Sequence, residues 1–415
     1  MKLVASVRLQ PTPEQAALLR STLERCNAAC DWLAGLAADT GILRRPYRGR
    51  GRQYDLHKLA YAELRSRFAL SAQAAVRCIA KVADSLKTGD KKTRRTFDKH
   101  AAQPFDERIF RFLPGQNAVS IWTLEGRQKI PFACGDRQDE LLKRAKGQVD
   151  LMFVRGKWML SATCEADEAP MVGAIDAIGV DMGIVNLAVD DSGKSYSGAQ
   201  VDDVRRRQHS RRRALQKVGT RSAKRALRRA SGKQARFQRH TNHVLSKAIV
   251  ADAERGQSLI ALEDLQGIRG RVQVKGHQRA RMANWGFHEL RSLIVYKAML
   301  LGVAVVFVDP RNTSRGCSCC GLIDKRNRPS RDKFQCIGCG FAAPADHNAA
   351  RNIRQRGLRA RSFVVALQGT RSRLSPEESR PLWLTVQYVL IMVAQGRRGG
   401  MARAAPAGSA PVSAQ

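Results

Sequence analysis

The sequence predicts a multidomain protein of the α/β class, in which an α+β amino-terminal half precedes a domain built on a mixed sheet. Three observations predict it: alternating and helical apolar patterns before residue 172, two later apolar runs that each meet an acid, and two pairs of cysteines. A chain of 415 residues is long enough for two or three domains with a sizeable core.

The first 90 residues predict one strand followed by helices. Residues 1–10 alternate apolar and polar side chains, as a half-buried strand does. Thr12 has the features of a helix N-cap, because Pro13 occupies the first helical position and Gln15 completes a capping box. Apolar residues then recur at helical spacing, so residues 11–90 predict a helical domain.

Residues 91–172 predict short strands separated by turns. Together with residues 1–10, these strands predict a small β-barrel. Trp122 and Trp158 lie in the alternating runs, where they either stack on nucleic-acid bases or belong to the core. We favour the core for both.

Two acids stand where an apolar strand would bury them. An apolar run in residues 178–184 ends at Asp181 beside glycines, and Glu263 interrupts the apolar run of residues 259–265. Asp346 opens an Ala-rich segment that predicts the first turn of a helix. A buried charge is costly unless it is paired or bound to a metal ion. Because two strands and a helix start can converge at one edge of a mixed sheet, the pattern predicts a site of three carboxylates.

Two cysteine pairs predict a structural zinc site. Cys317 and Cys320 form one C-x-x-C pair and Cys336 and Cys339 a second, a spacing that directs two thiolates from each turn at one ion. Four sulfurs saturate one Zn²⁺ and leave no position for a catalytic water. Cys319 leaves the register open, since it competes with Cys320 as the ligand. The alternative is a set of ordinary reduced cysteines, and either case fits a reducing cytoplasm.

The charge of the chain predicts a polyanionic partner. Lysine and arginine number 73 against 36 acids, a formal net charge of +37 that exceeds what solubility requires. Residues 204–240 contain no acid, whereas a solvated surface mixes both signs. We expect this run to contact nucleic-acid phosphates through Arg205, Arg206, Arg211, Arg212, Lys217, Arg221, Arg225, Arg228 and Arg236. With no signal peptide and no long apolar segment, no membrane partner is expected.

The order and spacing of these motifs resemble the TnpB family, the RNA-guided nucleases of insertion sequences that are related to type V CRISPR effectors. The resemblance is sharp between residues 177 and 353 and loose before them. Met182 and Cys319 depart from the usual family pattern, although neither is expected to bind metal in the active site. The matching segments are residues 179–184, 262–265, 309–314, the two cysteine pairs, and 346–353.

The resemblance implies a domain organisation. Residues 173–316 and 341–358 would form an RNase H-like nuclease domain of the RuvC type, and residues 317–340 an inserted zinc knuckle that binds target nucleic acid. The predicted barrel, residues 1–10 and 91–172, would be the wedge domain, and residues 11–90 the recognition lobe. Residues 359–415 lie beyond the resemblance, and we expect a largely disordered tail because its end is rich in Ala, Gly, Pro and Ser.

The resemblance also implies the activity, an RNA-guided DNA endonuclease of transposon origin. Asp181 would bridge two Mg²⁺ ions about 3.5–4 Å apart, and Glu263 and Asp346 would each complete one of them. The implied partners are a guide RNA and a double-stranded DNA target, bound by a protein monomer in the bacterial or archaeal cytoplasm, in association with the nucleoid.

Two other functions remain open. One is an unguided nuclease or transposase of the RuvC fold, and the other is a guided DNA-binding repressor that does not cut. The three intact acids argue against the repressor. The large amino-terminal half argues against the unguided nuclease, which does not need it.

Overall fold

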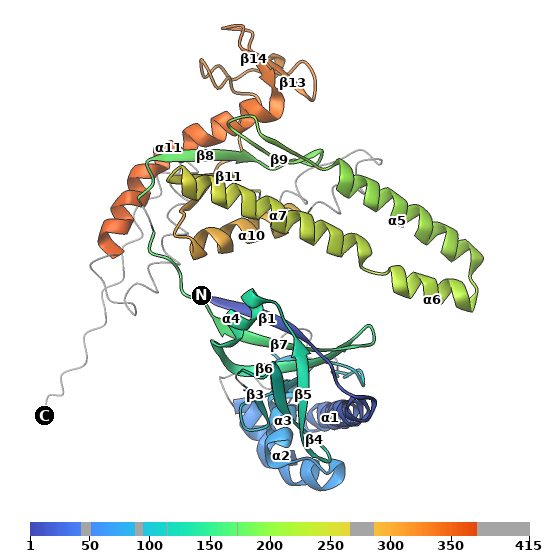
Figure 1. The fold of residues 1–415 in the computed structure, drawn as a ribbon. Helices are drawn as coiled ribbons and strands as arrows, with labels where there is room; N and C mark the ends of the chain where they lie inside the picture. The colour runs from blue at the N-terminus through green and yellow to red at the C-terminus, as the bar shows by residue number, and fades with distance from the viewer. Residues whose placement is uncertain (43–50, 88–93, 114, 172, 266–285, 372–415) are drawn as a thin grey trace, which may run out of the picture. The chain divides into compact units, whose positions relative to one another are not determined.

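The structure is a computed structural model that describes residues 1–42, 51–87, 94–113, 115–171, 173–265 and 286–371 (Figure 1). The chain divides into two compact units, Met1–Asp167 and Glu168–Gln415. The first combines an antiparallel sheet with helices, and the second combines a mixed sheet with helices on both of its faces. The mixed α/β, multidomain class that the sequence predicts is therefore confirmed.

The sheet of the first unit has seven strands in the order β2-β6-β7-β1-β5-β4-β3. Its edge strands, β2 and β3, are consecutive in sequence and are joined by a turn in which Ile109 N–H donates to the Asp106 carbonyl at 3.0 Å. Within the described residues no ladder pairs these two edges, so the predicted closed barrel is instead a near-barrel sheet. The strands are β1 (Lys2–Leu9), β2 (Gln103–Phe105), β3 (Phe110–Leu113), β4 (Ala118–Thr123), β5 (Gly126–Ala133), β6 (Ala145–Val154) and β7 (Lys157–Glu165).

The helices of the first unit are α1 (Pro13–Asp39), α2 (Gly51–Phe68), α3 (Ala72–Ser85) and the short α4 (Asp136–Leu142). The predicted capping box is present, since Thr12 Oγ1 accepts from Gln15 N–H at 3.3 Å and Gln15 Oε1 accepts from Thr12 N–H at 3.2 Å. Trp158 is buried in the core of the sheet, and half-buried Trp122 packs against both the sheet core and the helical core. The preference for core tryptophans therefore agrees with the structure.

The second unit contains a five-stranded sheet in the order β10-β9-β8-β11-β12. Strands β8, β11 and β12 are parallel, whereas β9 and β10 run antiparallel to their neighbours. Gly193 supplies the turn between β9 and β10 at a φ of 91°. The strands are β8 (Asp176–Asp181), β9 (Asn186–Asp190), β10 (Ser195–Ser197), β11 (Ser258–Glu263) and β12 (Val305–Val308).

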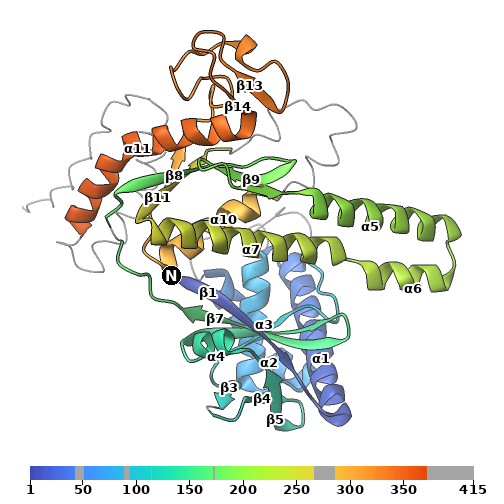
Figure 2. The same cartoon turned by 45° about the horizontal axis from the view of Figure 1, so that its top comes forward.

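Helices cover both faces of this sheet (Figure 2). Helices α7 (Lys233–Arg255) and α10 (Phe287–Leu300) pack on Ile260 and Leu262 of β11, while α11 (Ala345–Arg371) packs on Leu259 and Ala261. Because side chains alternate along a strand, every second residue of β8 and β11 faces α11. Helix α11 lies so close to β8 that a Cβ on Gly179 would stand 2.1 Å from the Ala350 carbonyl oxygen.

Two further parts extend from this unit. Helices α5 (Ala199–Val218) and α6 (Arg221–Ala230) project away from the sheet and α7 returns toward it (Figures 1 and 2). We call residues 199–240 the basic arm. Between β12 and α11, residues 317–340 form the knuckle, which holds strand β13 (Lys333–Gln335) paired with β14 (Ala342–Pro344).

Helix α11 is longer than the sequence suggests. It continues to Arg371, into the segment that we expected to belong to a disordered tail, and residues 372–415 of that segment lie outside the described residues. Among the helices that are described, none is long and apolar enough to cross a membrane.

Candidate active site and metal centre

The three predicted acids meet at one place. Asp181 and Glu263 are the last residues of the neighbouring parallel strands β8 and β11, where Leu262 is paired with Val180. In the alternation of side chains along each strand, both acids fall on the face that α11 covers. Asp346 is the second residue of α11. All three side chains line a single cavity of about 250 Å³. The sequence therefore identified acids that the fold brings together.

This cavity opposes the ionisation of its own carboxylates. Burial raises the pKa of Asp181 well above its usual range, and the charges of Glu263 and Asp346 add to the effect. The guanidinium of Arg328 acts in the opposite direction. Burial likewise raises the pKa of Glu263, against a hydrogen bond from Thr313 and the charge of Arg356. Such a cluster of buried acids gains stability from a cation.

Neutral donors contact two of the acids. Thr313 Oγ1 donates to Glu263 Oε1 at 2.5 Å, and Asn186 Nδ2 donates to Asp346 Oδ2 at 3.0 Å. Sequence reasoning did not assign a role to these donors or to Arg328, which lines the same cavity from within the knuckle. Thr313 does lie in the matching segment 309–314, but nothing in its type or spacing indicates a contact with Glu263.

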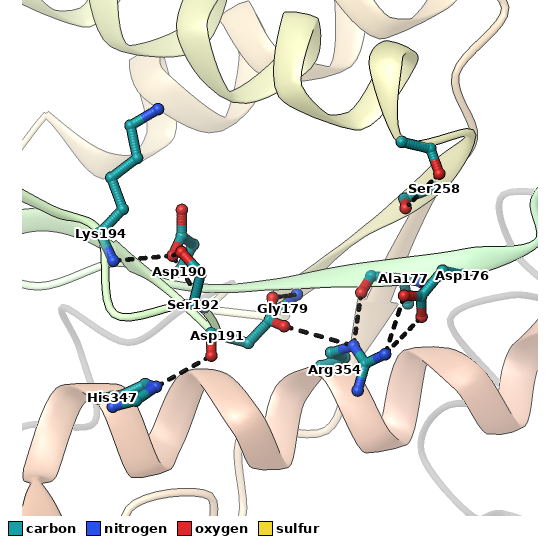
Figure 3. A network of polar contacts seen from close by, with 11 residues as sticks. Asp176, Ala177, Gly179, Asp190, Asp191, Ser192, Lys194, Ser258, His347 and Arg354 are labelled. Atoms are coloured by element: carbon teal, nitrogen blue, oxygen red, sulfur yellow. Dashed lines mark hydrogen bonds and ion pairs between the residues drawn. The ribbon is translucent and has the colours of Figure 1, made fainter.

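A polar network anchors the start of α11 to the sheet (Figure 3). Arg354 of α11 forms an ion pair with Asp176 at 2.7 Å and another with Asp191 at 3.3 Å, and it donates to the Ala177 carbonyl oxygen. His347 Nε2 donates to the Asp191 carbonyl oxygen at 2.9 Å. Because His347 follows Asp346 directly, this network fixes Asp346 relative to the strand that ends at Asp181.

The four predicted cysteines form one cluster. The sulfurs of Cys317, Cys320, Cys336 and Cys339 all lie within 4.8 Å of one another, whereas exposed Cys319 is not among them. The structure therefore favours Cys320 over Cys319 as the ligand. The backbone N–H of Cys339 lowers the pKa of Cys336 to about 6, whereas hydrogen bonds with the sulfurs of Cys320 and Cys317 raise the pKa of Cys339 to about 12. This cluster is suited to a structural metal ion.

Each cysteine pair begins a similar turn. Cys317 N–H donates to the Leu322 carbonyl at 3.0 Å, and Cys336 N–H donates to the Phe341 carbonyl at 2.8 Å. Buried Asn327 joins the two turns, since its Nδ2 donates to the Leu322 carbonyl and its Oδ1 accepts from Ile337 N–H. Backbone hydrogen bonds and the side chain of Asn327 therefore hold the two cysteine turns together without help from a metal ion.

Helix α11 is hydrogen-bonded to the chain that enters the knuckle. Asn348 Nδ2 donates to the Gly316 carbonyl, and its Oδ1 accepts from Ser318 N–H at 3.0 Å. Asn352 Nδ2 donates to the carbonyls of Thr313 and Gly316, both at 2.8 Å. The hydrogen bonds of Asn348 and Asn352 therefore link the helix that carries Asp346 to Thr313 and to the start of the cysteine cluster.

The predicted phosphate-binding residues all lie on the basic arm. Arg205 and Arg206 are paired with Asp202 and Asp203, the two acids that precede the acid-free run. The other seven predicted side chains are exposed, namely Arg211, Arg212, Lys217, Arg221, Arg225, Arg228 and Arg236. The structure brings these seven together on one projecting feature that is separate from the acids (Figure 1).

Comparison with known proteins finds relatives of this unit. Residues 287–353 match the family model described as the TNB domain of Cas12f1-like proteins. A CRISPR-associated endodeoxyribonuclease Cas12f1 of Sulfoacidibacillus thermotolerans is 32% identical over 217 residues, which cover 48% of this chain and 50% of that protein. The putative RNA-guided DNA endonuclease InsQ of Escherichia coli (strain K12) is 29% identical over 222 residues, which cover 49% of this chain and 54% of that protein. A TnpB-like protein of Methanocaldococcus jannaschii is 31% identical over 134 residues, which cover 32% of this chain and 48% of that protein.

These relatives resemble the chain as members of the TnpB family and as Cas12f nucleases. The resemblance seen in the sequence is therefore confirmed. The match to the family model runs from α10 into α11, and so includes the knuckle and Asp346. The chain spans about half the length of the curated relatives named above.

Proposed function

We propose that this chain is an RNA-guided DNA endonuclease of transposon origin, and that Asp181, Glu263 and Asp346 form its cutting site. The convergence of three carboxylates from three elements in one cavity carries the proposal. The order and direction of the five strands support an RNase H-like domain of the RuvC type. Relatives that are named RNA-guided DNA endonuclease or CRISPR-associated endodeoxyribonuclease support guided cutting of DNA.

The acids fit a pair of Mg²⁺ ions. Mg²⁺ prefers hard oxygen ligands, and burial together with mutual repulsion makes this cluster unfavourable without a cation. When bound, two such ions supply an activated water and neutralise charge at the phosphorus. Asp181, whose charge interacts with both other acids, is suited to bridge the ions, with Glu263 and Asp346 holding one each. Arg328 faces the same cavity and is placed to bind the phosphate of the strand to be cut.

The cysteine cluster fits one Zn²⁺ ion with a structural role. Cys317, Cys320, Cys336 and Cys339 supply four sulfurs, the complete tetrahedral set for zinc. The knuckle that they close carries Arg328 and connects to Thr313 through α11. We propose that zinc holds these groups in place.

The charge supports nucleic-acid partners. A net charge of +37 fits a guide RNA and a double-stranded DNA target, with the basic arm contacting phosphates. We propose that one copy of the chain binds one guide RNA.

The cutting site is tested by replacing each acid with its amide. Asp181→Asn, Glu263→Gln and Asp346→Asn are each expected to lower the Mg²⁺-dependent cutting rate by at least ~100-fold, because lost metal ligation removes several kcal/mol of charge stabilisation. Binding to the matched DNA is expected to persist. Asp332→Asn, which changes an exposed acid of the knuckle, is the control that keeps wild-type cutting. Cutting by Asp346→Asn at the wild-type rate would show that the assignment is wrong.

Guidance is tested by expressing the chain with and without its flanking noncoding DNA. A guided enzyme copurifies with one discrete RNA and cuts only a plasmid that matches the end of that RNA. Equal cutting of matched and scrambled plasmids by RNA-free protein would instead establish an unguided nuclease. Tight binding to the matched plasmid without cutting would establish a repressor.

A further inference from the structure

Two residues outside the acid set each contact one carboxylate oxygen of the site. Thr313 Oγ1 contacts Oε1 of Glu263, and Asn186 Nδ2 contacts Oδ2 of Asp346. Both donors are neutral, so they can contact a carboxylate without competing as a cation would. Each contact occupies one oxygen and leaves the other oxygen of the same carboxylate for a further partner.

Thr313 is held on several sides. It is 3% exposed, and its backbone carbonyl accepts from Asn352 of α11 at 2.8 Å. The hydroxyl has one hydrogen and two acceptors, Glu263 Oε1 at 2.5 Å and the Pro310 carbonyl at 3.0 Å. The shorter contact with an acidic oxygen is the stronger one. The side chain of Glu263 is therefore restrained by a residue that is itself restrained.

Asn186 is placed by the tight connection between β8 and β9. The backbone returns so closely that a Cβ on Gly183 would lie 2.7 Å from the Asn186 carbonyl oxygen. This return brings Asn186, the first residue of β9, to Asp346 on α11. The amide thereby joins the start of β9 to the start of α11.

We propose that Thr313 and Asn186 are positioning residues, which orient Glu263 and Asp346 so that the free oxygen of each points to the divalent cation that this acid would hold. This inference rests on the proposed metal-dependent function. Hydrogen bonds from outside the ligand set fix the orientation of metal-binding side chains, and their loss lowers metal affinity by about 10–100-fold. The third acid, Asp181, reaches the site from the end of β8, so the two donors act on the two acids that have to meet it.

The proposal is tested by Mn²⁺ binding to the full chain freed of RNA, measured from the electron paramagnetic resonance signal of unbound Mn²⁺. Thr313→Val is expected to weaken Mn²⁺ binding by about 10–100-fold, and Thr313→Ser, which keeps the hydroxyl, to restore it. Asn186→Leu tests the second contact independently. Thr123→Val, which removes a buried hydroxyl in the first unit, is the matched control.

Cutting assays add a second readout. The Mg²⁺ concentration that gives half-maximal cutting is expected to rise by the same factor in Thr313→Val and Asn186→Leu, while the KM for DNA is unchanged. A purely structural defect would lower the melting temperature and the cutting rate at every Mg²⁺ concentration.

The outcomes separate this inference from the proposed function. Wild-type Mn²⁺ affinity in both Thr313→Val and Asn186→Leu, with loss of binding in Asp181→Asn, would overturn the positioning role and leave the metal site intact. Equal Mn²⁺ binding by wild type and Asp181→Asn would overturn the proposed metal site and this inference with it. If Thr313→Val does not fold, the result for Asn186→Leu decides.

Discussion

At the scale of single residues, the buried carboxyl of Asp181 is expected to lower the stability of the protein. Its pKa is raised in the folded protein by burial and by the two neighbouring acids, so the folded state binds its proton more tightly than the unfolded state does. A carboxyl of this kind lowers the free energy of unfolding as the pH rises from its unfolded pKa through its folded pKa. The metal-free site is therefore expected to destabilise the protein at neutral pH.

Replacing Asp181 with asparagine is expected to stabilise the protein when Mg²⁺ and Mn²⁺ are absent and zinc is retained. We expect a gain in the free energy of unfolding, because the asparagine variant no longer has to hold an ionised carboxyl among buried acids. The gain should be larger near about pH 8 than near about pH 5. Thermal melts of Asp181→Asn and of the Asp332→Asn control measure it, and a lower melting temperature for Asp181→Asn would contradict the prediction.

Sequence reasoning located the acids but not their supports. Asp181 and Glu263 are visible because a charge at the end of a buried apolar strand is unusual in any sequence. Thr313, Asn186 and Arg328 are ordinary polar residues in loops or at a strand start, and only the fold brings them to the acids. These contacts join segments that are far apart in the sequence. The spacing of apolar residues indicates only local secondary structure, so it cannot predict them.

At the scale of elements, alternation predicted strands correctly but not how they close. The first unit has the expected strands, yet no ladder joins its edge strands in the part of the chain that the structure describes, because β2 pairs with β6 and β3 with β4. Helix α11 was recognised at its start, where Asp346 and the Ala-rich turn mark it. The family motif stops at residue 353 and sets no end for the helix, which continues to Arg371.

The knuckle provides a matched pair of cysteines for testing the metal centre. Cys336→Ser is expected to lower both the zinc content and the melting temperature, because a structural zinc site contributes folding energy directly. Cys319→Ser changes an exposed cysteine outside the cluster and is expected to retain one zinc per chain. Metal analysis of gently purified, reduced protein measures both. Equal zinc content in the two variants would show that Cys336 is not a ligand.

At the scale of the whole molecule, charge is unevenly distributed. The basic arm combines exposed cations with few acids, whereas the cations around α4 of the first unit have acidic partners, such as Lys143 with Glu140 and Lys146 with Glu165. Only unpaired cations are well placed to release counterions from nucleic acid. The positive charges that make up the net charge of +37 are therefore not equally available to nucleic acid.

This difference predicts the salt dependence of DNA binding. Changing Arg221, Arg225 and Arg228 together to glutamine is expected to reduce the slope of log K against log[salt] by up to about 3, since each phosphate contact contributes roughly 0.9. Changing Lys143, Arg144 and Lys146 together to glutamine removes the same amount of charge from cations that have acidic partners. This control is expected to change the slope of log K against log[salt] little. Filter binding over a salt series compares the two, and equal slopes would contradict a role for the basic arm.

The order of the elements along the chain has a consequence for synthesis. Strands β8 and β11 and the basic arm leave the ribosome early, while Asp346 follows only after the knuckle, at the start of α11. Domains fold as the chain emerges, from the amino terminus onward. On the proposed assignment, a nascent or prematurely terminated chain therefore holds nucleic acid through the basic arm but has only two of the three acids. On the same assignment, cutting is the last property that the growing chain acquires, and incomplete copies are expected to bind DNA without cutting it.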